Sequence, residues 1–122
     1  MSSLKTQEIE EVLVVNFTDA KILDEARITQ IGQELMNCAA SAGQKKKMLL
    51  NFQGVQFMSS AMIGKLVLLN KKCRTDEVVL KMCSISANVM EVFKITRLNK
   101  VFEIFDDQDK ALKSFSKKGW FG

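Results

Sequence analysis

The sequence contains no histidine, and this absence removes most of the familiar catalytic machinery. Catalytic triads, Cys/His pairs and typical transition-metal sites rely on imidazole as the base or the ligand. Hydrolase and metalloenzyme functions are therefore disfavoured. We predict that the protein is not an enzyme, with no catalytic residue, no metal site and no other cofactor.

Proline is absent as well, and there is no Pro/Gly-rich linker, internal repeat or low-complexity tract. At 122 residues, of which 47% are hydrophobic, the chain can form one core but is too short for two. The sequence therefore predicts one unbroken domain at 1–115, followed by a C-terminal tail at 116–122. The tail contains the pair Trp120-Phe121, which either packs back on the domain or stays exposed.

Long hydrophobic runs and a secretory signal are also missing. The apolar stretches are far shorter than the roughly 20 residues that cross a bilayer, and the N-terminal segment lacks the charged-then-apolar pattern of a signal peptide. Cys38, Cys73 and Cys83 are odd in number and lie in apolar patterns, which indicates reduced, buried thiols. We predict a cytoplasmic protein without a membrane span.

Positive charge is present but modest. The formal net charge of +4 comes largely from short lysine runs at 45–47, 71–72 and 117–118, which acidic segments separate. No aromatic residues interleave with these runs, as they do on surfaces that bind nucleic acid. We interpret the lysines as solvated turns and a tail, and expect no nucleic-acid partner.

Strand patterns and helix patterns alternate along the chain. β-branched and short apolar runs predict strands at 12–17, 48–52, 78–82 and 102–105, with a weaker one at 5–9. Apolar residues at helical spacing predict helices from Asp24 toward Gly43, from the Ser59-Ser60 pair to Cys73, at 88–95 after a Ser86 cap, and at 107–115. This alternation implies right-handed crossovers and a mainly parallel sheet, to which the first hairpin adds a mixed edge.

Ser59 and Ser60 stand where the second helix is expected to begin. Free N–H groups and the positive end of the helix dipole favour a phosphate at such a position. A plainer alternative is that one of the two serines only caps the helix. Two interpretations also exist for the flanking methionines: core packing is favoured for Met58, whereas Met62 is equally compatible with the core and with a partner interface.

The order of these elements, together with the phrase Phe57-Met58-Ser59-Ser60-Ala61-Met62-Ile63-Gly64, resembles the STAS domain of bacterial anti-sigma factor antagonists. The resemblance spans nearly the whole chain. In the family motif Asp-Ser-[Ser/Thr]-Gly-Leu-Gly, Ser60 takes the place of the serine that a partner kinase phosphorylates, and Gly64 matches the last glycine. Replacements of the other four motif residues stand at Ser59, Ala61, Met62 and Ile63.

This resemblance implies an α/β STAS fold, with a four- to five-stranded mixed, mostly parallel sheet and about four helices packed mainly on one face. It also implies an anti-sigma factor antagonist, which regulates transcription by docking on an anti-sigma factor or serine-protein kinase. Phosphorylation of Ser60, or alternatively of Ser59, would switch the docking off. The partner-binding residues that it implies are Asp19, Asp24, Met58, Ser59, Ser60, Met62 and Ile63.

Two alternatives stand beside this prediction. The purely structural interpretation of Asp19 and Asp24 is that they cap a helix and compensate the helix dipole. The replaced aspartate and glycine of the motif favour a second function, that of a non-switching STAS adaptor or scaffold in a signalling or lipid-transport complex.

Overall fold

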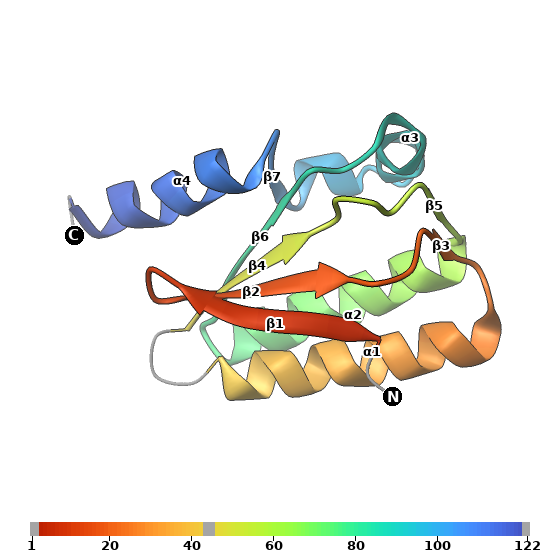
Figure 1. Ribbon diagram of the computed structural model, residues 1–122, viewed down its shortest axis with the longest axis horizontal. Coiled ribbons are helices and arrows are strands. Elements are labelled where there is room, and N and C mark those ends of the chain that lie inside the picture. The colour runs from red at the N-terminus through yellow and green to blue at the C-terminus, as the bar shows by residue number, and fades with distance from the viewer. Residues whose placement is uncertain (1–2, 43–45, 121–122) are drawn as a thin grey trace.

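A five-stranded sheet in the order β1-β2-β4-β6-β7 runs through the middle of the computed structural model (Figure 1), which describes the backbone of residues 3–42 and 46–120 and the side chains up to residue 116. Only β1 and β2 pair antiparallel, whereas the other three strand pairs are parallel. The mixed, mostly parallel sheet that we predicted is confirmed. Its strands are β1 (Leu4–Ile9), β2 (Val12–Phe17), β4 (Lys47–Asn51), β6 (Val79–Cys83) and β7 (Glu103–Phe105).

The central strands are apolar on both faces because helices cover both sides of the sheet. Val15 of β2 lies beside Leu50 of β4, and both side chains belong to the larger core. The alternate neighbours Val14 and Leu49 point to the other face and belong to a smaller core. Two separate clusters of buried side chains therefore stabilise the sheet, one on each face.

The helices divide unequally between these faces. α1 (Glu25–Ser41) and α2 (Ser60–Thr75) pack against each other on one face, below the sheet in Figure 1. α3 (Ala87–Ile95), followed by the short 3-10 helix η1 (Leu98–Lys100), contributes to the same larger core. α4 (Gln108–Trp120) covers the opposite face instead. We expected the helices to pack mainly on one face of the sheet. Three of them, α1, α2 and α3, do so, whereas α4 packs on the other face.

α4 is longer than the helix that the sequence predicts at 107–115. It continues to Trp120, so the predicted boundary between domain and tail at residue 115 falls inside a helix. Ala111, Leu112 and Phe115, which share one side of the helix, pack on the sheet and fix the first half of α4. The side chain of Trp120 and the whole of Phe121 lie outside the described residues.

Two predicted helix caps are confirmed by their hydrogen bonds. The Asp24 carboxylate accepts the backbone N–H of Arg27 at 2.9 Å, and the Ser86 hydroxyl accepts that of Val89 at 3.2 Å. Each bond satisfies one of the free N–H groups in the first turn of its helix. Gly43, which we expected just past the end of α1, lies outside the described residues.

The turn between β1 and β2 strains two glutamates, and this suggests a stabilising substitution. Glu10 and Glu11 have φ angles of 50° and 71°, in the left-handed region that a two-residue hairpin turn requires. Because glycine enters this region without a steric penalty, Glu11→Gly is expected to raise the free energy of unfolding by about 0.5–1 kcal/mol in urea titrations. Gln7→Gly, in the extended strand, serves as the control and is expected to lower it; equal effects of both variants would contradict the argument.

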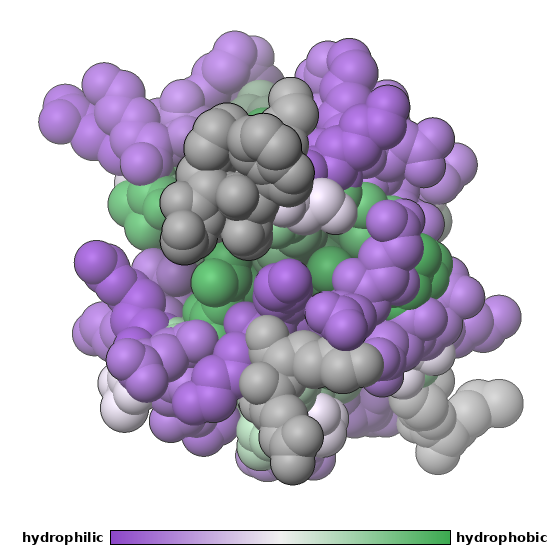
Figure 2. All heavy atoms as spheres, turned by 90° about the vertical axis from the view of Figure 1, so that its left-hand side faces the viewer, coloured by the Kyte–Doolittle hydropathy of each residue, from purple (hydrophilic) through white to green (hydrophobic). Residues whose placement is uncertain are grey.

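The end of the molecule that carries this turn is mostly hydrophilic. Figure 2 views that end and shows hydrophilic side chains around a smaller band of hydrophobic ones. Glu10, Glu11, Lys46 and Glu77 are all exposed. The opposite end of the sheet, to which the parallel strands point, has a different character.

Candidate functional site

The Ser59-Ser60 pair lies beyond the carboxyl ends of the parallel strands, at the edge where α/β proteins commonly bind their ligands. A second, two-stranded parallel sheet stands there, at the right of Figure 1, formed by β3 (Lys21–Ile22) and β5 (Phe57–Met58). The sequence analysis missed both strands because two residues are too short for a recognisable alternation. This small sheet connects the loop before α1 with the start of α2.

Backbone hydrogen bonds hold the segment before α2 in place. Gly54, with a φ of +90°, turns the chain, and the N–H of Val55 donates to the carbonyl of Phe52 at 2.9 Å. The carbonyl of Ala20 then accepts the N–H of Gln56 at 2.7 Å and that of Phe57 at 3.2 Å. The N-terminus of α2 is therefore presented on a fixed support.

Ser59 and Ser60 differ sharply in accessibility. Ser60 is the first residue of α2 and is exposed. Ser59 occupies the N-cap position, with its N–H bonded to the carbonyl of Ile22 at 3.1 Å. Its hydroxyl oxygen, however, is buried and forms no hydrogen bond with any described group. The expectation that a serine side chain caps α2 is thus wrong for Ser59, and Ser60 is the hydroxyl that an enzyme can reach.

The start of α2 also lacks negative charge. Its first turn contains no acidic residue, whereas Glu25 provides one in the first turn of α1. The N–H groups of Ser60 and Ala61 point out of the helix end because the helix has no preceding carbonyls to accept them. An anion at Ser60 would therefore meet a favourable and uncompensated dipole.

The two predicted aspartates already have partners within the chain. The carboxylate of Asp19 accepts two bonds from the Arg27 guanidinium, at 2.8 and 3.0 Å, and this neighbour lowers the pKa of Asp19. Asp24 caps α1, as described above, and is exposed. Both carboxylates stabilise the loop before α1, so the capping interpretation is realised for Asp24, and Asp19 has an ion pair rather than a cap.

Three apolar residues that we predicted as partner contacts are buried in the larger core. Met58 is 6% exposed, Met62 is 0% exposed and Ile63 is 5% exposed. Met62 and Ile63 point inward because α2 buries that stripe of its surface against the sheet, and Met58 of β5 belongs to the same core. In this conformation they offer a partner little or no surface, and the complete burial of Met62 agrees with its core interpretation.

Other apolar residues are exposed at this end, and the sequence analysis did not identify them. Leu23 is 54% exposed and Phe57 is 42% exposed, with the ammonium of Lys21 5.8 Å from the centre of the Phe57 ring. The only signal was the alternation of Phe57 with buried Met58, which places the two side chains on opposite sides of β5. We call Lys21, Leu23, Phe57 and Ser60 the β3–β5 surface.

Comparison with known protein families identifies the fold. The model of the STAS domain matches residues 3–111, which is most of the chain. The chain belongs to the STAS domain family. The match includes the β3–β5 surface and all elements that support it, and it ends within α4.

Solved structures of several other proteins resemble this one in fold. The anti-sigma-factor antagonist (STAS) domain protein from Planctomyces limnophilus gives a TM-score of 0.82 at 23% identity, covering 94% of this chain and 99% of that one. The phosphorylated form of the Bacillus cell fate determinant SpoIIAA gives 0.68 at 17% identity, covering 92% and 98%. The murine anion transporter Slc26a9 gives 0.67 at 21% identity, covering 87% of this chain and 18% of the transporter. These likenesses establish the fold, and function has to be argued from the site.

Two features are absent from the described part of this STAS domain. No helix there is long and apolar enough to cross a membrane. Nowhere among the same residues do three or more cysteine or carboxylate side chains gather in a way that could hold a metal ion.

Proposed function

We propose that this STAS domain is a non-enzymatic, cytoplasmic anti-sigma factor antagonist, which regulates transcription by docking its β3–β5 surface on an anti-sigma factor with serine-kinase activity. We further propose that phosphorylation of Ser60 ends the docking. The observation that carries the proposal is the exposed Ser60 at an uncompensated helix N-terminus, which the pairing of β3 with β5 brings to the same end of the fold as the exposed Leu23 and Phe57. The family resemblance supports it.

A phosphate on Ser60 would change the surface without disturbing the fold. It adds about −1.5 to −2 charges, which the N-terminus of α2 accommodates. The same charge opposes close contact with the exposed apolar side chains nearby, because a partner that covers Leu23 and Phe57 would have to desolvate it. Docking would be lost while the domain stays folded.

Incubation with ATP and the anti-sigma serine kinase encoded in the same genome tests the switch directly. Mass spectrometry is expected to place the phosphate on Ser60, to find it retained in Ser59→Ala and to find none in Ser60→Ala. Ser59→Ala is a matched control because the buried Ser59 hydroxyl has no described hydrogen-bond partner to lose. A phosphate on Ser59, or on neither serine, would contradict the phosphoswitch.

Ser60→Asp is expected to weaken binding of that kinase by roughly tenfold or more, which corresponds to about 1.4 kcal/mol. Its melting temperature should stay at or slightly above that of the wild type, because a carboxylate near a helix N-terminus is stabilising. Calorimetric titration measures the first quantity and thermal unfolding the second. Unchanged affinity in Ser60→Asp would argue against the proposed switch.

A non-switching adaptor role is the second candidate, and the replaced motif residues favour it. Ser59 stands where the family has an aspartate, and its side chain does not cap α2. Met62, in place of a glycine, is completely buried. Affinity capture of partners separates the two functions, because only the antagonist role predicts an anti-sigma serine kinase among them.

A further inference from the structure

A groove follows the line where α1 and α2 pack together, on the face that they turn away from the sheet. Two hollows of about 370 and 210 Å³ adjoin there and share Thr29, Lys65 and Leu68 in their walls. On α1 the walls run from Glu25 to Met36, which is about 16 Å at 1.5 Å per residue. The groove therefore has the length of about three helical turns.

Gly64 lines this groove, and no close packing against another element requires a glycine there. A Cβ atom at Gly64 would meet no described atom within 4 Å, although glycine weakens a helix relative to alanine. Gly32 on α1 is different, because a Cβ there would lie 2.8 Å from Cδ of Lys65. Gly32 thus makes room for a side chain of the chain itself, and Gly64 leaves room for something else.

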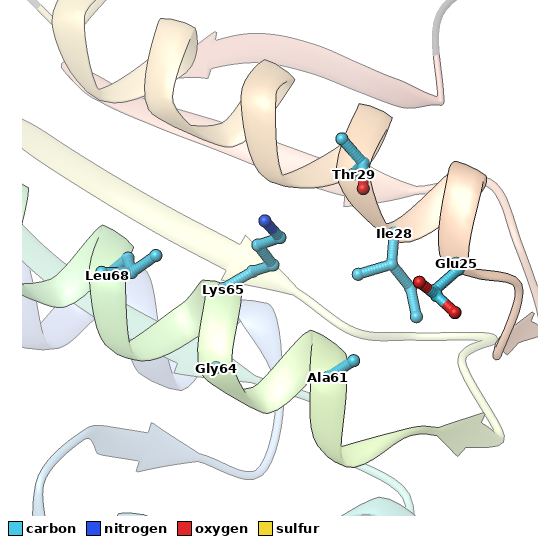
Figure 3. A pocket seen from close by; sticks show the side chains of 7 residues that line it. All are labelled: Glu25, Ile28, Thr29, Ala61, Gly64, Lys65 and Leu68. Atoms are coloured by element: carbon cyan, nitrogen blue, oxygen red, sulfur yellow. The ribbon is translucent and has the colours of Figure 1, made fainter.

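Lys65 places a positive charge in the middle of the groove. Its aliphatic stem lies over Gly32, and Figure 3 shows the side chain rising from α2 toward α1. No carboxylate in the described part of the chain forms an ion pair with it. Glu25 lines the same hollow, near Ile28 and Ala61 at its other end. The groove thus presents a cation that forms no ion pair with the carboxylate at its other end.

Apolar surface surrounds this cation. Leu68 is 52% exposed, whereas most other leucines in the described part of the chain are buried. Together with Ile28 and Ala61 it gives the groove an apolar wall on either side of Lys65. A groove with apolar walls, a cation near its middle, a carboxylate at one end and a glycine in its lining fits an amphipathic helix better than a small polar ligand.

We propose that the α1–α2 groove receives an amphipathic helix of the partner protein, with a carboxylate that pairs with Lys65 and a small or apolar side chain over Gly64. The groove begins at Ala61, directly after Ser60, so a partner on the β3–β5 surface can reach it. In this respect the inference rests on the proposed function. Opposite charge at Lys65 and close approach at Gly64 then orient the partner along α2.

Binding of the same anti-sigma serine kinase to groove variants tests the inference. Gly64→Leu fills the groove and Lys65→Glu reverses its charge, and each is expected to weaken binding by roughly tenfold or more. Gly64→Ala intrudes little and should stay within about threefold of the wild type. Lys71→Glu is the matched control for charge, because Lys71 is exposed on α2 and does not line the groove. Thermal unfolding checks that Gly64→Leu is folded, since no described atom obstructs its Cβ.

Salt provides an independent measurement of the proposed ion pair. Raising the salt concentration from about 0.1 M to about 1 M should weaken binding of the wild type more than that of Lys65→Gln, because it shortens the screening length. An equal salt effect on both would overturn the role of Lys65.

The outcomes separate this inference from the proposed function. If the kinase binds Gly64→Leu and Lys65→Glu as tightly as the wild type, the proposed role of the groove in binding is overturned, whereas the antagonist role stands. If the kinase does not bind the wild type at all, both are overturned. Self-association of the domain in sedimentation experiments, abolished by Gly64→Leu without any effect on kinase binding, would show that the occupant is a second copy and would also overturn the inference.

Discussion

Phe52→Ala is expected to lower the free energy of unfolding by about 3–5 kcal/mol, the usual cost of removing a large aromatic side chain from a core. Phe52 follows β4 and is 0% exposed. Its ring stacks on that of Phe17 with centroids 4.7 Å apart and meets the edge of Phe93 at 6.4 Å. The substitution therefore leaves a cavity where β2, β4 and α3 meet.

Phe57→Ala is the natural comparison, because it removes the same ring five residues later, where 42% of the residue is exposed. We expect it to cost under about 1 kcal/mol of stability, since exposed substitutions seldom cost more, but to weaken partner binding. Urea titration of both variants measures the difference. A loss of less than about 1 kcal/mol in Phe52→Ala would show that the aromatic cluster is not what holds this end of the sheet.

Lys81→Ala is expected to cost about 2–4 kcal/mol, although lysine is usually a surface residue. Lys81 is 1% exposed on β6, beneath α4. Its ammonium donates to the hydroxyl of Ser114 at 2.8 Å and lies 3.6 Å from the Glu103 carboxylate and 4.7 Å from the centre of the Phe115 ring. Truncation removes both this polar junction and the aliphatic stem that fills the space under α4.

Lys81→Met separates these two contributions. Methionine keeps a stem of similar length and removes the charge, and replacement of a buried charged group by an apolar one is often neutral. Glu103 stays solvated because 55% of its side chain is exposed, so we expect Lys81→Met to lie within about 1 kcal/mol of the wild type. Chemical unfolding of the two variants decides the matter. If Lys81→Met lowers the free energy of unfolding as much as Lys81→Ala does, the charge of Lys81, and not its aliphatic stem, holds α4 on the sheet.

Periodicity predicted the main elements well because each has a strong local signal. The apolar run of β2 was predicted with both of its ends, and the Asp24 and Ser86 caps hold the helices that we expected. The two-residue strands β3 and β5 have no such signal, and their pairing depends on a contact between Lys21 and Phe57, which are far apart in the sequence. Tertiary contacts of this kind leave no periodic trace.

The candidate site was predicted in position but not in detail. Sequence comparison placed Ser60 at the start of α2, where the structure has it exposed. It could not tell that the Ser59 hydroxyl turns inward, that Met62 is buried or that Phe57 is exposed, because each depends on how β5 enters α2. The same limitation hid Lys81, since a lysine in a strand is normally assigned to the solvent face.

Each of the two separate cores contains one buried cysteine, so the opening of each core can be followed chemically. Cys73 belongs to the larger core and Cys83 to the smaller one beneath α4. Burial raises the pKa of the Cys73 thiol to about 11 and also raises that of Cys83, so neither forms the reactive thiolate readily while it is covered. Alkylation of Cys83 would therefore report the opening of the smaller core beneath α4, and alkylation of Cys73 the opening of the larger core.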